Sequence, residues 1–82
     1  MIDPPTRLLR VVGESLYGPS WQTPLAEALD LNVRTVQRWA RSERQPSLDT
    51  WLRLAALVRH RRADLEDILD AIAAERQRRI KR

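Results

Sequence analysis

The sequence lacks the residues that several kinds of chemistry require. It contains no cysteine in 82 residues, so disulfides, thiolate metal ligands and thiol nucleophiles are excluded. Only two glycines are present, and they form no glycine-rich loop of the kind that cradles phosphates. No hydroxyl or carboxylate has an evident catalytic partner in the pattern. We therefore expect no enzyme, no cofactor, no metal site and no small-molecule substrate.

Long hydrophobic runs are also absent. The first seven residues, MIDPPTR, lack the apolar core of a signal peptide, and no stretch approaches the ~18 apolar residues of a membrane span. Hydrophobic residues nevertheless make up 43% of the chain, well above the level of a disordered protein. We expect one soluble, cytoplasmic domain over residues 1–82 without a membrane partner, in which residues 1–5 and 77–82 are flexible.

The charge balance is basic. The formal net charge is +4, and fourteen of the fifteen basic residues are arginine. A positive balance favours a polyanionic partner. Arginine suits planar, bidentate contacts with phosphates and guanine edges better than lysine does, although a GC-rich genome also enriches arginine.

Helical periodicity accounts for the whole chain, and no segment has the pattern of a strand. We expect an all-α, compact five-helix domain, with helices near residues 6–17, 22–29, 33–42, 48–60 and from 64 onward. Gly18 with Pro19 ends the first helix, and Asn32 and Ser47 are good N-caps. Ser20 and Thr23 both remain possible caps of the second helix, because Pro24 fits only its first turn. The last two helices can form one continuous helix, since nothing in residues 59–63 breaks it.

The most informative stretch is residues 22–39, QTPLAEALDLNVRTVQRW. Its apolar spacing predicts two short helices packed across a tight turn. In the second of these, Arg34, Arg38 and Arg41 fall within about 60° of one another at about 100° per residue, opposite Val36 and Trp39. One face anchors the helix and the other presents arginines, as a helix that reads a DNA groove requires. A solvated arginine face is the alternative interpretation.

A wider set of residues has the spacing of a known family. The matching positions are Gln22, Thr23, Ala26, Leu29, Leu31, Val36, Trp39 and the run Arg44-x-Pro46-Ser47-Leu48. Residues 21–58, just under half of the chain, thereby resemble the helix-turn-helix domain of the phage-repressor/Cro-type regulators, also called the xenobiotic-response-element-like family. The flanking helices fit the family's five-helix plan. Two departures stand out, because the family usually has glycine at the position of Asp30 and often has it at the position of Ser42.

The resemblance implies a role for individual residues on DNA. The residues that would face the bases are Asn32, Val33, Arg34, Gln37, Arg38 and Arg41. Arginine can grip guanine O6 and N7, and Gln37 or Asn32 can read adenine, whereas Val33 is as well explained by helix packing. The residues that would contact phosphates are Gln22, Thr23, Arg44 and Ser47.

The resemblance also implies a function. We expect a sequence-specific regulator of transcription that binds double-stranded DNA, in a prokaryote or phage, most simply a repressor that occludes a promoter. One recognition helix covers few base pairs, so we expect a homodimer on a palindromic operator. The candidate dimer interface is Leu54, Leu57, Leu65, Ile68, Leu69 and Ile72. Alternatively this stripe closes the core of the monomer, or the chain is an antitoxin or adaptor that holds a partner protein.

The tryptophans and the histidine fit structural roles. The helical positions of Trp39 and Trp51 predict core packing, while that of Trp21 stays open. His60 lies near a helix end, where a cation is favoured, and no second ligand type clusters near it. We interpret the basic tail as a solubilising end in preference to a phosphate-binding arm. Its residues are Arg76, Arg78, Arg79, Lys81 and Arg82.

Overall fold

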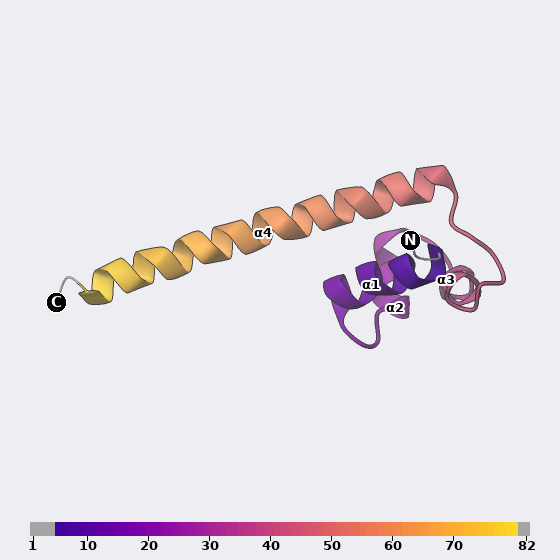
Figure 1. Ribbon diagram of the computed structural model, residues 1–82, viewed down its shortest axis with the longest axis horizontal. Coiled ribbons are helices and arrows are strands. Elements are labelled where there is room, and N and C mark those ends of the chain that lie inside the picture. The colour runs from indigo at the N-terminus through magenta and orange to yellow at the C-terminus, as the bar shows by residue number, and fades with distance from the viewer. Residues whose placement is uncertain (1–4, 81–82) are drawn as a thin grey trace.

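The computed structural model describes residues 5–80, which form four α-helices and no strand. These are α1 (Pro5–Tyr17), α2 (Gln22–Ala28), α3 (Val33–Ala40) and α4 (Leu48–Ile80). The first three helices form a small bundle against the beginning of α4, and the rest of α4 runs away from that bundle (Figure 1). The expected all-α class is therefore confirmed.

The expectation of five helices in a compact domain is wrong. Residues 48–80 form one helix of 33 residues, because no glycine, proline or cap interrupts the chain between the two segments that we expected. A helix of that length spans about 50 Å, and the molecule accordingly measures 58 × 31 × 23 Å. We expected residues 1–5 and 77–82 to be flexible. Of these, Pro5 is the first residue of α1 and residues 77–80 are the last four of α4, whereas residues 1–4 and 81–82 lie outside the described residues.

Local signals define most helix ends. Gly18 adopts a φ of 80° directly after α1. The Asn32 side chain accepts a 2.8 Å hydrogen bond from the N–H of Arg34, and Ser47 Oγ accepts one of 3.2 Å from the N–H of Thr50. Both predicted caps are thus confirmed. At α2 the N-cap is Trp21, which makes no side-chain capping bond, so neither of the two hydroxyls that we considered caps this helix.

The turn between α2 and α3 has the left-handed backbone conformation that glycine favours, although it contains no glycine. Asp30 adopts a φ of 56°. Its N–H bonds to the carbonyl of Glu27 at 3.1 Å, and the N–H of Leu31 bonds to the carbonyl of Ala26 at 2.9 Å. This bond pair is the Schellman motif, in which a left-handed residue satisfies the last carbonyls of a helix. Aspartate tolerates that conformation better than most residues with a Cβ, so the turn forms despite the departure from glycine.

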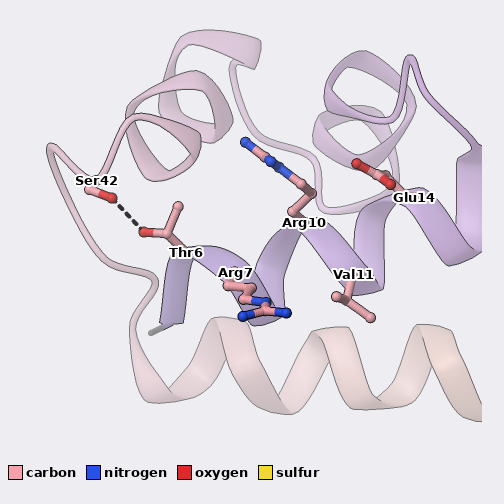
Figure 2. Close-up of a pocket in the computed structure, with 6 residues that line it drawn as sticks. All are labelled: Thr6, Arg7, Arg10, Val11, Glu14 and Ser42. Carbon is pink, nitrogen blue, oxygen red and sulfur yellow. Dashed lines mark hydrogen bonds between the residues drawn. The ribbon is translucent and has the colours of Figure 1, made fainter. Parts of the chain in front are cut away.

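The same geometry recurs at the end of α3. Ser42 has a φ of 63°, and the N–H groups of Ser42 and Glu43 bond to the carbonyls of Trp39 and Arg38 at 3.1 and 2.9 Å. The helix therefore ends at Ala40, two residues before the expected end. The Ser42 hydroxyl also lies 2.7 Å from that of Thr6 on α1 (Figure 2), so the second departure from the family pattern gives a tertiary contact.

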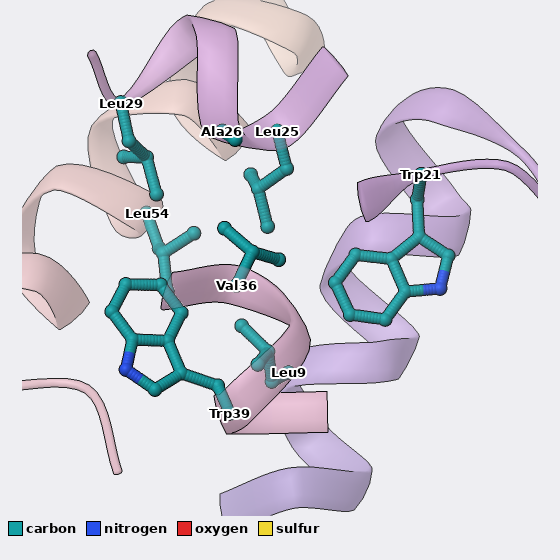
Figure 3. Close-up of a cluster of buried hydrophobic side chains, with 8 residues drawn as sticks. All are labelled: Leu9, Trp21, Leu25, Ala26, Leu29, Val36, Trp39 and Leu54. Carbon is teal, nitrogen blue, oxygen red and sulfur yellow. The ribbon is translucent and has the colours of Figure 1, made fainter. Parts of the chain in front are cut away.

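Eight hydrophobic side chains form the core between the helices (Figure 3). They are Leu9, Trp21, Leu25, Ala26, Leu29, Val36, Trp39 and Leu54. Trp39 is 6% exposed, which confirms its predicted core position, and Trp51 is partly buried against the cluster. Arg53 of α4 donates a 2.5 Å hydrogen bond to the carbonyl of Leu29, and this bond joins α4 to the end of α2.

Candidate nucleic-acid interface

Helix α3 has one buried face and one arginine-rich face. Val36 and Trp39 are buried in the core, while Arg34 and Arg38 are exposed. Because these two pairs lie on opposite sides at about 100° per residue, packing of the apolar pair turns the two guanidinium groups outward. The buried Val36 and Trp39 fix the orientation of the helix, and the arginines remain accessible to an external ligand.

The other residues expected to read bases differ in how accessible they are. Asn32 is exposed, but its side-chain oxygen is occupied as the cap of α3, which leaves its amide N–H groups for a base. Gln37 is half-buried. Val33 is partly buried against the core, in keeping with its helix-packing interpretation. Arg41 is exposed and lies 3.9 Å from the carboxylate of Glu43, so its charge has an acidic neighbour.

A small hollow brings a predicted base-reading residue beside a predicted phosphate-binding one. It has a volume of about 290 Å³ and is lined by Thr35, Arg38, Trp39 and Arg44. Arg44 comes from the loop between α3 and α4, so the loop adds a second arginine to the hollow beside Arg38. Thr35 was not among the expected site residues. Its position directly after Arg34, within the first turn of α3, is the only sequence signal that would have suggested it.

The remaining phosphate-binding candidates lie at helix N-termini. Gln22 and Thr23 are the first two residues of α2. Ser47 is exposed, and its hydroxyl is engaged with both the N–H and the hydroxyl of Thr50. Any attraction of Ser47 for an anion would therefore come through the free N–H groups of the first turn of α4.

The residues expected at a dimer interface fall into two groups. Leu54 is 2% exposed and belongs to the core, and Leu57 is partly buried against it. The other four lie on the projecting part of α4, where their exposed fractions run from 47% to 64%; they are Leu65, Ile68, Leu69 and Ile72. We call residues 58–80 the α4 arm. Every residue of the arm is exposed except Glu75, which is half-buried.

Glu75 is held by two arginines of the same helix. Its carboxylate accepts a 2.6 Å hydrogen bond from Arg78 and one of 2.9 Å from Arg79. These two guanidinium groups, Arg78 first, hold the pKa of the Glu75 carboxyl below its usual value. Two of the basic residues near the end of the chain are therefore committed to an ion pair within the helix.

Helices α2 and α3, packed across a tight turn with the arginines of α3 facing outward, have the arrangement of a helix-turn-helix. Residues 22–59 match the model of the helix-turn-helix family HTH_3, a segment that comprises α2, α3 and the first part of α4. This match confirms the resemblance to the Cro/C1-type domains and suggests a DNA-binding regulator. No curated protein and no solved structure matches the chain. Among residues 5–80, no helix is both long and apolar enough to cross a membrane.

Proposed function

We propose that this protein regulates transcription by inserting α3 into the major groove of a specific double-stranded DNA site. The observation that carries the proposal is the exposure of Arg34 and Arg38 on α3, opposite the buried Val36 and Trp39. A guanidinium group matches the O6 and N7 acceptors of guanine, and each such pair contributes about 1–3 kcal/mol of discrimination. Asn32, Gln37 and Arg41 would complete the base-reading set.

Contacts with the DNA backbone would position α3 in the groove. Arg44 shares a hollow with Arg38, so a phosphate bound by the first residue would lie next to a base read by the second. Gln22, Thr23 and the N-terminus of α4 at Ser47 would supply further phosphate contacts. Such contacts fix the register of the protein but carry little sequence information.

We further propose that the protein acts as a homodimeric repressor in the cytoplasm. The eight residues of α3 can cover only a few base pairs, and two copies on a near-palindromic site would supply the missing specificity. The apolar residues of the α4 arm offer the surface for a second copy, and a bound dimer would occlude a promoter. The same arm would also suit a different partner protein, as in an antitoxin, and this is the competing interpretation.

Selection of bound sequences from random duplex DNA tests the proposal directly. We expect enrichment of a two-fold symmetric motif with guanines in each half-site. The double variant Arg34→Ala/Arg38→Ala should fold normally, because both side chains are exposed, and should lose the guanine preference. Failure of the wild type to enrich any duplex motif at low salt would overturn the proposal, and enrichment of an asymmetric motif would overturn its homodimeric part.

A further inference from the structure

The α4 arm carries an apolar stripe that the chain itself leaves uncovered. Val58, Leu65, Ile68, Leu69 and Ile72 span about 100° around the helix at about 100° per residue, and each is at least 43% exposed. Leu54 falls within the same sector but is buried by the α1–α3 bundle. The stripe is therefore a continuation of the core-facing side of α4 beyond the point where the bundle ends (Figure 1).

Several charged residues lie within or beside this stripe, and two of opposite sign, Arg61 and Glu75, stand at symmetrical positions. Arg76 and Arg79 also fall within the same sector, near the end of the arm. Arg61 lies within the stripe and Glu75 lies at its edge, seven residues before and seven residues after Ile68. Both fall on the same side of the line through Leu65 and Ile72. When such a helix pairs with a second copy of itself, each of these residues can meet the same residue of the other copy. Otherwise it meets the residue of opposite charge.

We propose that two copies of the chain pair antiparallel through their α4 arms, crossing near Ile68, so that Arg61 of each copy meets Glu75 of the other. This proposal rests on the homodimer of the proposed function and adds its orientation. In a parallel pair each Arg61 would face the other Arg61, and each Glu75 the other Glu75. Like charges opposed across an interface repel each other and weaken the pairing. In the antiparallel pair each Arg61 instead lies opposite the partner's Glu75, whose carboxylate also accepts hydrogen bonds from Arg78 and Arg79 of its own helix.

The length of the arm fits the same arrangement. Ile68 lies within one residue of the midpoint of residues 58–80, so an antiparallel crossing there covers both arms along their full length. The end of one arm would then reach the base of the other, where there is a hollow of about 190 Å³. It is lined by Leu16, Tyr17, Leu57, His60, Arg61 and Asp64. Glu75, already held by Arg78 and Arg79, would bring its carboxylate to this region.

The orientation has a consequence for the DNA site. Leu54 is fourteen residues from Ile68, or about 21 Å, so the two Leu54 residues would be about 42 Å apart. Helix α3 lies at the N-terminal end of α4 (Figure 1), and the two copies of α3 would be further apart still. One turn of DNA is about 34 Å. We therefore expect half-sites separated by two turns of DNA, whereas a parallel pair would place the two bundles side by side.

Charge exchange tests the orientation. Arg61→Glu and Glu75→Arg should each raise the dissociation constant of the dimer at least about tenfold, because each replaces an attraction with a repulsion. The double variant Arg61→Glu/Glu75→Arg should return to the wild-type value. Sedimentation equilibrium of the full chain gives all four constants. Arg59→Glu, the same charge change on the outward side of the arm, is the matched control and should leave the constant nearly unchanged.

The outcomes separate this inference from the proposed function. A wild-type dimer that neither single exchange weakens would overturn the antiparallel orientation and leave the dimer standing. A wild type that stays monomeric at high concentration would overturn both. Titration of each variant with DNA that contains a single half-site reports on α3 alone. If the wild type does not bind this half-site, DNA recognition by α3 would be overturned, whatever the arms do.

Discussion

Gly13 lies so close to the indole ring of Trp21 that a Cβ at position 13 would overlap the ring. Gly13 is buried in the middle of α1, and Trp21 stands immediately before α2 with 4% of its surface exposed. The absence of a side chain at position 13 thus allows α1 to pack directly on the tryptophan that precedes the helix-turn-helix. This contact gives a core role to Trp21, whose position the sequence left open.

Replacement of Gly13 by alanine should destabilise the domain by about 1–3 kcal/mol, because the ring must shift within a packed core. Urea unfolding followed by tryptophan fluorescence measures the change. Ser15→Ala is the control, since Ser15 is exposed on the same helix and alanine has the higher helix propensity. A Gly13→Ala protein as stable as the control would show that α1 and Trp21 are not in close contact.

Trp39→Ala should cost about 3–5 kcal/mol, because it removes a large buried aromatic side chain and leaves a cavity. That loss is comparable to the whole stability of a small domain. Trp51→Ala should cost less, since Trp51 is only partly buried. Thermal unfolding distinguishes the two variants. An unchanged melting temperature for Trp39→Ala would mean that residue 39 faces solvent and that α3 is rotated relative to the arrangement described above.

Arg38→Ala and Arg44→Ala should weaken DNA binding in different ways. The first should lose about 1–3 kcal/mol of affinity for the preferred site and relax the preference at one base pair in each half-site. The second should weaken all sequences similarly and reduce the salt dependence, because one phosphate contact is lost. Titrations on specific and scrambled duplexes at several salt concentrations measure both effects. Equal losses without any change of preference would contradict the proposed recognition face.

Ile72→Glu should give a folded monomer. Ile72 is 51% exposed within one chain, so glutamate there disturbs no core contact, but it would place an unpaired charge in the proposed interface. Affinity for a single half-site should persist, while affinity for the full palindrome should fall, because linked half-sites gain from effective concentration. Ala74→Glu, on the outward side of the arm, should remain dimeric. Light scattering that finds Ile72→Glu as dimeric as Ala74→Glu would exclude this surface.

Asp30→Gly should stabilise the domain by up to about 1 kcal/mol. Asp30 has a φ of 56°, a conformation that a Cβ makes unfavourable and that glycine adopts freely. Asp30→Ala is the matched control, because it also removes the charge next to the C-terminal end of α2 but keeps the Cβ. Chemical unfolding should rank the glycine variant above the alanine variant. The reverse order would mean that the turn is not strained by the side chain.

Most local features of the site could be predicted from the sequence. Asn32 and Ser47 have side chains that cap the next helix, and the spacing of Val36 and Trp39 identifies the buried side of α3. The outward position of Arg34 follows from the same spacing. These features depend on residues within one or two turns of each other, so the order of the side chains along the chain is sufficient to determine them.

The tertiary structure alone decided which parts of each apolar face are covered. Leu54 and Ile72 lie on the same side of α4, yet the first is buried and the second exposed. Periodicity identifies a face of a helix but not how far its neighbours extend along it. The bundle of α1–α3 covers only the beginning of α4. The sequence did show that residues 59–63 contain no helix break, but it could not show that the apolar stripe beyond them stays uncovered and does not fold back as a fifth helix on the core.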